Sequence, residues 1–226
     1  MTFNRLQKEN PILAGRYNLK RAIMELGPTG FPFERFVAEI LKEYGYETKV
    51  DEHVRGHCVT HEVDVIAEKG EKRFMIECKY HNVRGLRSDV KVALYTYARF
   101  LDVKHLFHQA WLVTNTKCTS QAIDYGRCVG LKIIGWRYPK DEGLEYLIEN
   151  KGLYPITILP SLTNNPFGNL RVNGERSRTI NFKEKLARQN FILARDLLNY
   201  SVNDLSRLTG IQPDIVEKLQ SEAKEL

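Results

Sequence analysis

Two carboxylates and one amine occur close together near the middle of the chain: Asp64, then Glu77 and Lys79. Two carboxylates at one place repel each other unless a cation or a shared proton compensates their charge, and carboxylate oxygens are the ligands that Mg²⁺ prefers. A lysine beside such a metal can hold a water molecule or a phosphate oxygen next to it. These residue types can therefore hydrolyse a phosphodiester, with a metal to polarise the phosphate and a cation to steady the negative charge.

The segments that carry these residues are predicted to pair as the two strands of a hairpin closed by the loop 69–72. With Glu68 opposite Arg73, Asp64 lies directly across from Glu77, and directly opposed side chains share a face with Cβ atoms about 5 Å apart. The lysine shares that face because strand side chains alternate. The other face has the character of core: Phe74, Ile76, Cys78 and Tyr80. The alternative is a solvated hairpin face, against which the apolar neighbours of Asp64 argue: Val63, Val65 and Ile66.

Glu34 is a fourth candidate for the site. It lies beside Phe33 and Val37, at the margin of an apolar helical stripe, and no Lys or Arg stands four residues away to pair with it. From that margin it can face the sheet; the alternative is a solvated glutamate that the helix dipole favours in a first turn. Two further residues could contact a DNA phosphate, namely His81 and Lys91, although a surface role is the simpler interpretation of both.

The rest of the pattern supplies the elements that must position these residues. Periodicity predicts helices at residues 17–26, 33–44, 89–103, 120–129 and 142–150, and strands at residues 47–54, 61–67, 73–80, 110–114 and 131–136. Ser88 is the predicted N-cap of the third helix. The buried stripe of that helix is predicted to be Val90, Leu94, Tyr97, Ala98 and Leu101. A strand meander followed by β-α-β units implies an α/β fold with a mixed sheet flanked by helices.

The composition limits the class of protein. The chain has 226 residues, a hydrophobic fraction of 42%, and no apolar stretch near the roughly 20 residues that span a bilayer. Its N-terminus has no signal-peptide pattern, so we expect a cytoplasmic protein, in a prokaryotic cytosol or nucleoid, without a membrane partner. The formal net charge of +6 favours a polyanionic partner such as nucleic acid. No two of the four cysteines form a C-x-x-C pair, which favours free thiols in a reducing compartment over a zinc site.

A change in amino-acid composition divides the chain into parts. Proline, glycine and asparagine become frequent from residue 154 to residue 179, and residues 181–226 are predicted to be helical again. We expect an N-terminal helical extension at residues 1–27, an α/β domain at 28–152, a linker at 153–180 and a small all-α domain at 181–226.

Three segments in this order resemble the PD-(D/E)XK nuclease superfamily, which has the restriction endonuclease-like fold. Within it the chain is most similar to the Mrr-like catalytic domain, in the bacterial group often found with an ATP-cone. The segments are Gly30-Phe31-Pro32-Phe33-Glu34-Arg35-Phe36-Val37, His61-Glu62-Val63-Asp64-Val65-Ile66-Ala67 and Ile76-Glu77-Cys78-Lys79-Tyr80. The resemblance covers about residues 17–150. No nucleotide-binding segment precedes it in this chain, so an ATP-cone would belong to a longer protein.

The resemblance implies a role for each residue of the pattern. Asp64 and Glu77 match the metal ligands, and the Cys78 backbone carbonyl is a further ligand in that family. Lys79 matches the catalytic lysine, and Glu34 the helix acid that supports the metal site. The implied cofactor is Mg²⁺, for which Mn²⁺ can substitute, and the implied substrate is DNA. The chain departs from the pattern in lacking the usual proline before Asp64 and in having a cysteine where a smaller apolar residue is usual.

The C-terminal segment resembles a helix-hairpin-helix module, with a hairpin at residues 208–211 and a helix at 214–226. Gly210 would permit the tight turn, and the backbone amides there would face a DNA phosphate. Residues 186–198 resemble a degenerate first copy, with Asn190 where a glycine is usual. The alternative is a plain helical bundle.

Several functions stay open at this point. One is a metal-dependent endonuclease in restriction or defence against foreign DNA, and another is the same chemistry in DNA repair or Holliday-junction resolution. A third is a DNA-binding module that does not cut, which the basic charge favours and the intact acidic set opposes. An RNA substrate has no supporting stacking motif. A double-strand cut needs two active sites, which a homodimer would supply.

Overall fold

The computed structural model describes residues 18–27, 29–163 and 182–226, and the chain divides into two compact units. One unit is Met24–Lys151, and the other combines Met1–Ile23 with Gly152–Leu226. The domain boundaries expected from the sequence stay predictions, and most of the expected linker falls outside the described residues. Within the described residues, no helix has the length and apolar character needed to cross a bilayer.

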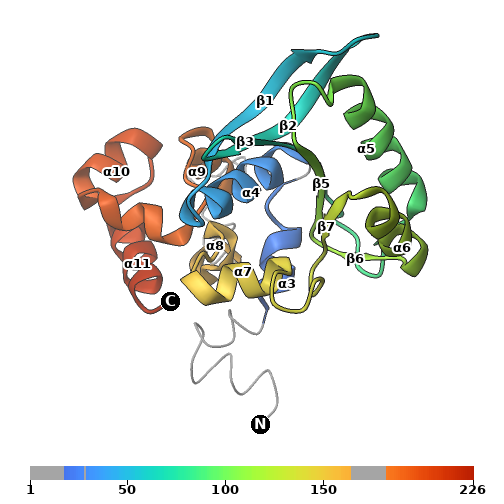
Figure 1. The fold of residues 1–226 in the computed structure, drawn as a ribbon. Coiled ribbons are helices and arrows are strands. Elements are labelled where there is room, and N and C mark those ends of the chain that lie inside the picture. The colour runs from blue at the N-terminus through green and yellow to red at the C-terminus, as the bar shows by residue number, and fades with distance from the viewer. Residues whose placement is uncertain (1–17, 28, 164–181) are drawn as a thin grey trace, which may run out of the picture. The chain divides into compact units, whose positions relative to one another are not determined.

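A five-stranded mixed sheet forms the centre of the first unit (Figure 1). Its order is β1-β2-β3-β5-β7, from β1 (Glu47–Arg55), β2 (Thr60–Lys69), β3 (Lys72–Lys79), β5 (Gln109–Thr114) and β7 (Lys132–Ile134). The first three strands form an antiparallel meander, whereas β3, β5 and β7 are parallel to one another. The predicted mixed sheet is therefore confirmed, and β3 lies at the junction of its antiparallel and parallel halves.

Helices flank this sheet, with α4 (Phe31–Glu43) on one side of it and α5 (Val90–Val103) and α6 (Ser120–Val129) on the other (Figure 1). A proline in the first turn favours the start of α4, and its apolar stripe is buried: Phe33, Phe36, Val37, Ile40 and Leu41. The Thr119 side chain caps α6, and Gly130 ends it in the left-handed conformation, as predicted. The unit is completed by α7 (Leu144–Lys151) and by a small parallel pair of β4 (Arg87–Ser88) with β6 (Lys117–Cys118).

Two predictions about α5 are wrong. The N-cap is Asp89, whose side chain accepts hydrogen bonds from the backbone N–H groups of Lys91 and Val92. Ser88 is instead buried, and its hydroxyl donates to Thr114 Oγ1 at 3.2 Å. The physical reason is that Ser88 pairs with β6 as part of β4, which places the first free side-chain oxygen at the next residue.

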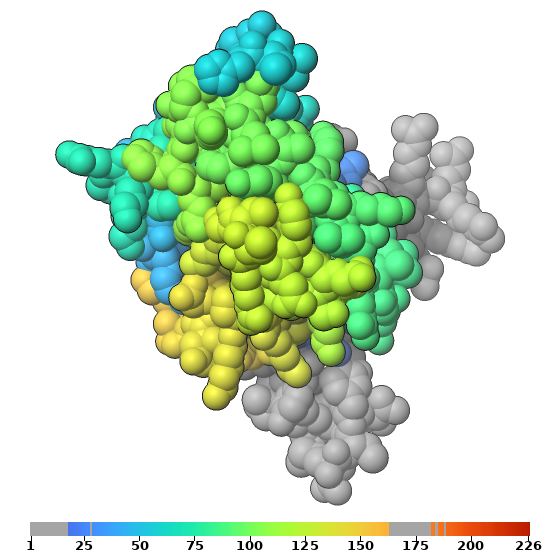
Figure 2. Space-filling view, turned by 45° about the vertical axis from the view of Figure 1, so that its right-hand side comes forward, coloured from blue at the N-terminus to red at the C-terminus, as the bar shows by residue number. Residues whose placement is uncertain are grey.

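The predicted buried stripe of α5 is also wrong at Leu94, Ala98 and Leu101, which are exposed, although Tyr97 does pack against the core. The helix buries Ala93, Thr96 and Val103, whereas Leu94 and Leu101 are 44% and 45% exposed. Ala93 lets the helix approach the sheet and α6 closely, with Tyr97 and Phe100 packed partly buried beside it. Figure 2 looks onto the side of this unit that α5 and α6 form.

The second unit is helical, in agreement with the predicted all-α part. It contains η1 (Ile156–Ile158), α8 (Pro160–Thr163), α9 (Phe182–Arg188), η2 (Ala194–Asn199), α10 (Val202–Thr209) and α11 (Pro213–Lys224). The helix α3 (Leu19–Met24) begins there too, and the Ala22 carbonyl accepts a 2.6 Å hydrogen bond from Thr157. Gly210 and Asn190 both take left-handed backbone angles, with φ of 63° and 64°. Asn190 therefore has a backbone conformation that favours glycine, and the degenerate first copy stays a prediction.

Candidate active site

The register of β2 with β3 brings the predicted carboxylates together. Val65 pairs with Ile76 and Glu68 with Arg73, so the next position along the ladder sets Asp64 opposite Glu77. The backbone N–H of Cys78 donates a 2.7 Å hydrogen bond to Asp64 Oδ2. This bond ties the Asp64 carboxylate to the strand that carries Glu77, as the predicted hairpin register requires.

Burial makes both carboxyl groups harder to ionise. The pKa of Glu77 is raised to about 7, first by burial and then by the charge of Asp64, against the opposing effect of Arg99 and Lys79. The pKa of Asp64 is raised by burial too, although the Cys78 N–H and Arg99 act to lower it. The two groups therefore carry a cost of charge that Arg99 offsets only in part and that a further cation would relieve.

Glu34 lies in the first turn of α4, and its carboxyl group interacts electrostatically with Asp64 and Glu77. Its pKa is raised to about 7, first by burial and then by the charges of Asp64, Asp51, Glu62 and Glu77. No hydrogen bond or ion pair joins its carboxylate to any residue that the structure describes. The role of Glu34 in the acidic cluster stays a prediction, which the effect of Asp64 and Glu77 on its pKa favours.

Lys79 ends β3, in register with Thr114 of the parallel neighbour β5. Its side chain is exposed, and its ammonium has no ion pair with the described part of the chain. It acts on the cluster through space, because its charge lowers the pKa of Glu77. The Lys79 ammonium stands two residues after the partly buried Glu77 on the same strand. In that position it is suited to hold a phosphate oxygen or a water molecule.

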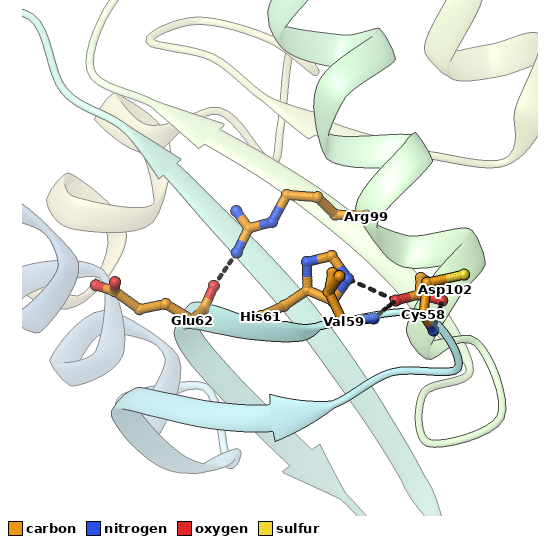
Figure 3. Close-up of polar contacts among 6 residues, drawn as sticks. All are labelled: Cys58, Val59, His61, Glu62, Arg99 and Asp102. Atoms are coloured by element: carbon orange, nitrogen blue, oxygen red, sulfur yellow. Dashed lines mark hydrogen bonds and ion pairs between the residues drawn. The ribbon is translucent and has the colours of Figure 1, made fainter.

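Sequence reasoning missed Arg99, which the structure brings into this cluster from α5. Its Nη1 donates to the carboxylate of Glu77. Its Nη2 donates to the backbone carbonyl of Glu62, the bond that Figure 3 shows. The predicted stripe of α5 pointed away from Arg99. The available signal was its position three residues after Thr96 and four before Val103, on the face that is buried.

Asp51 was also missed. In the ladder between β1 and β2, Val50 pairs with Val65 and Glu52 with Val63, so Asp51 stands at the position opposite Asp64. Its φ of 58° is in the left-handed region, which costs a non-glycine residue about 1 kcal/mol or more. Nothing in its residue type distinguished it from other surface acids.

The donor set suits a hard divalent cation. Glu34, Asp64 and Glu77 offer carboxylate oxygens in one region, and each has a raised pKa that a nearby cation would lower. No three His, Cys, Asp or Glu side chains of the described residues are close enough to form a ready-made metal cluster. The Cys78 carbonyl as a ligand stays a prediction.

The residues predicted to contact DNA lie in different surroundings. His81 is half-buried, its ring Nε2 lies 3.1 Å from Ser88 Oγ, and burial followed by the charge of Lys79 lowers its pKa. Lys91 is exposed in the first turn of α5. Gly210 belongs to the other unit, where its N–H donates to the Ser206 carbonyl at 2.8 Å. That amide is therefore already satisfied, and all three phosphate contacts stay predictions.

Comparison with known proteins identifies the family of this chain. Residues 28–136 match the Mrr catalytic family, described as a restriction endonuclease. An uncharacterized protein of Archaeoglobus fulgidus is 41% identical over 191 residues, which cover 84% of this chain and 99% of the relative. The crystal structure of a protein of unknown function, AF1548, superposes with a TM-score of 0.69 at 39% identity, over 87% of this chain and 97% of that one. The chain belongs to the Mrr-type restriction endonuclease family.

The family match spans α4 to β7, so it contains every element that carries Glu34, Asp64, Glu77 and Lys79. This assignment confirms the predicted PD-(D/E)XK relationship and the restriction endonuclease-like fold. The restriction endonuclease domain makes the protein a nuclease, and it implies DNA as the substrate class.

Proposed function

We propose that this Mrr-type protein is an endonuclease that hydrolyses DNA phosphodiester bonds with a divalent metal ion, Mg²⁺ or Mn²⁺. The observation that carries the proposal is the bond from the Cys78 N–H to Asp64, because it sets that carboxylate beside Glu77 at the end of β3 where Lys79 also stands. A bound metal would polarise the phosphate and lower the pKa of the attacking water.

The chain's own residues have separate tasks in this proposal. Asp64 and Glu77 hold the cation, and Glu34 adds negative charge from α4 at the same place. Lys79 holds a phosphate oxygen or the attacking water through its ammonium, which the fold leaves exposed. The net charge of +6 supports binding of the DNA backbone by the surface around the site.

The test is cleavage of supercoiled plasmid with and without Mg²⁺ or Mn²⁺, comparing the parent protein with Lys79→Ala. We expect metal-dependent nicking or linearisation that Lys79→Ala lacks, with DNA binding retained. Lys72→Ala is the matched control, because Lys72 is an exposed lysine at the opposite end of β3 and should leave cleavage unchanged. Full cleavage by Lys79→Ala would remove that residue from the mechanism.

We propose restriction or defence against foreign DNA as the biological role, since the family match is to a restriction endonuclease. Repair and Holliday-junction resolution would use the same chemistry. Unmodified plasmid, methylated plasmid and a four-way junction, compared in the same assay, separate these roles by which substrate is cut fastest. Linear product without a nicked intermediate would support a homodimer with two active sites.

A further inference from the structure

Arg99 forms an ion pair with a carboxylate of the acidic cluster, and it comes from α5, whereas Glu77 comes from β3. Its side chain is 11% exposed, that of Glu77 is 16% exposed, and the two form an ion pair. A second N–H group of Arg99 donates to the Glu62 carbonyl, and its guanidinium carbon lies 5.3 Å from the centre of the Tyr95 ring. The guanidinium is therefore held from three sides (Figure 3 shows its bond to Glu62).

This ion pair engages a carboxylate that the proposed metal site would use. A carboxylate that accepts hydrogen bonds from a guanidinium has its lone pairs directed at that group, and a divalent ion beside it would meet a positive charge in a partly buried setting. Arg99 acts to lower the pKa of Glu77 and also that of Asp64, so its charge does part of what a metal would do for both groups.

We propose that Arg99 is an internal counter-ion that holds Glu77 in the metal-free protein and must leave it for a divalent cation to bind. The inference rests on the proposed function, because it takes Glu77 to be a metal ligand. The Glu62 carbonyl and the Tyr95 ring do not depend on Glu77, so they can keep the guanidinium at the rim of the site after it is displaced.

Two consequences follow from this competition. The apparent metal affinity is reduced by the free energy of breaking the Arg99–Glu77 pair, so removal of the arginine tightens metal binding. The metal-free protein is less stable without the arginine, because breaking a buried pair leaves an uncompensated charge. A positioning role that helps Glu77 to bind metal predicts the opposite change in affinity.

The experiment is titration calorimetry of Mn²⁺ binding in the absence of DNA, on the full chain. Arg99→Met keeps the length of the side chain and removes its charge, and we expect it to bind Mn²⁺ about tenfold more tightly than the parent. Arg99→Lys keeps the charge and should stay close to the parent. Lys91→Met, which removes a cation of the same helix that has no contact with the carboxylates, should leave the affinity unchanged.

A second measurement needs no variant and covers the case in which Arg99→Met does not fold. In the parent protein with ¹⁵N-labelled arginine, addition of Mg²⁺ should shift the Arg99 side-chain resonances, and Asp64→Asn should abolish that shift. Weaker or equal Mn²⁺ binding by a folded Arg99→Met, or arginine resonances that Mg²⁺ leaves in place, would overturn the counter-ion role. Failure of the parent and of Arg99→Met to bind Mn²⁺ would overturn the metal site of the proposed function as well.

Discussion

The backbone N–H of Cys78 and the carboxylate of Asp64 are joined by a hydrogen bond of 2.7 Å. The bond crosses from β3 to β2 just beyond the last ladder pair, Val65 with Ile76. It fixes the rotamer of the acidic side chain and at the same time satisfies a buried backbone donor. Asp64 therefore has a structural task that is separable from metal binding.

Asp64→Asn should separate the two tasks. The amide oxygen can still accept the hydrogen bond from Cys78, so we expect stability close to that of the parent, whereas Asp64→Ala leaves the N–H unsatisfied and costs about 1–3 kcal/mol. Both variants should lose metal binding and at least about 100-fold in cleavage, since a metal ligand is gone. Urea denaturation and plasmid cleavage measure the two effects. Equal stability of the two variants would show that the hydrogen bond contributes nothing.

Glu34→Gln should stabilise the metal-free protein at alkaline pH. The pKa of Glu34 is about 7 in the folded protein, against about 4.3 for an unfolded glutamate, so its carboxyl lowers stability progressively as pH rises between these two values. Because the side chain is half-exposed, we discount for solvent screening and expect a gain of about 1 kcal/mol at pH 8 and none at pH 4. Urea denaturation at both pH values checks this.

The control for that experiment is Glu39→Gln on the same helix. Glu39 is an exposed partner of Lys42 and should change stability by less than about 0.5 kcal/mol at either pH. An equal gain from both variants would point to net charge rather than to the acidic cluster.

Asp102 should contribute stability that disappears in acid. Burial acts to raise its pKa, but hydrogen bonds from His61 and from the backbone N–H groups of Cys58 and Val59 outweigh burial and hold the pKa well below its usual range. A group with a depressed folded pKa stabilises above the unfolded value of about 3.9, and the contribution is lost as pH falls below it. Asp102→Asn should lower Tm at pH 7, and the difference from the parent should shrink as pH falls from 4 toward 2. A constant difference across that range would contradict the assignment.

The corrected face of α5 can be tested with two neighbouring residues. Ala93 is fully buried against Leu112 and Ala122, so Ala93→Gln should overpack the core, bury an amide and cost more than about 2 kcal/mol. Leu94→Gln should change stability by no more than about 0.5 kcal/mol because that side chain is 44% exposed. Chemical denaturation gives the free energy of unfolding of both variants. A large loss of stability in Leu94→Gln would mean that the buried face of α5 is wrongly assigned.

The sequence could predict those site residues whose relative positions depend only on hairpin register and helix periodicity. A short loop and the alternation of side chains fix the register of β2 with β3, so Asp64, Glu77 and Lys79 could be related to one another before any tertiary structure was known. Glu34 was accessible for a similar reason, since a helical stripe defines its own margin.

The rest depends on contacts between distant elements. Hydrophobicity favours large side chains as the inner face of α5, but close packing there uses Ala93 and Thr96, so the sequence pattern selects the wrong face. Arg99 lies on the true inner face, and its partner Glu77 is 22 residues earlier in the chain. Asp51 joins the cluster because β1 pairs with β2 and because its backbone is left-handed. Neither feature can be predicted from an aspartate in the sequence.

The contacts of Asp102 tie the end of α5 to the turn between β1 and β2. The backbone N–H groups of Cys58 and Val59 donate to its carboxylate, and the N–H of His57 donates to its carbonyl. Hairpin ends usually fray independently of the rest of a domain. Here the three bonds couple the turn to the last turn of the helix, so the amides of His57, Cys58 and Val59 should be protected from exchange with solvent together with those at the end of α5.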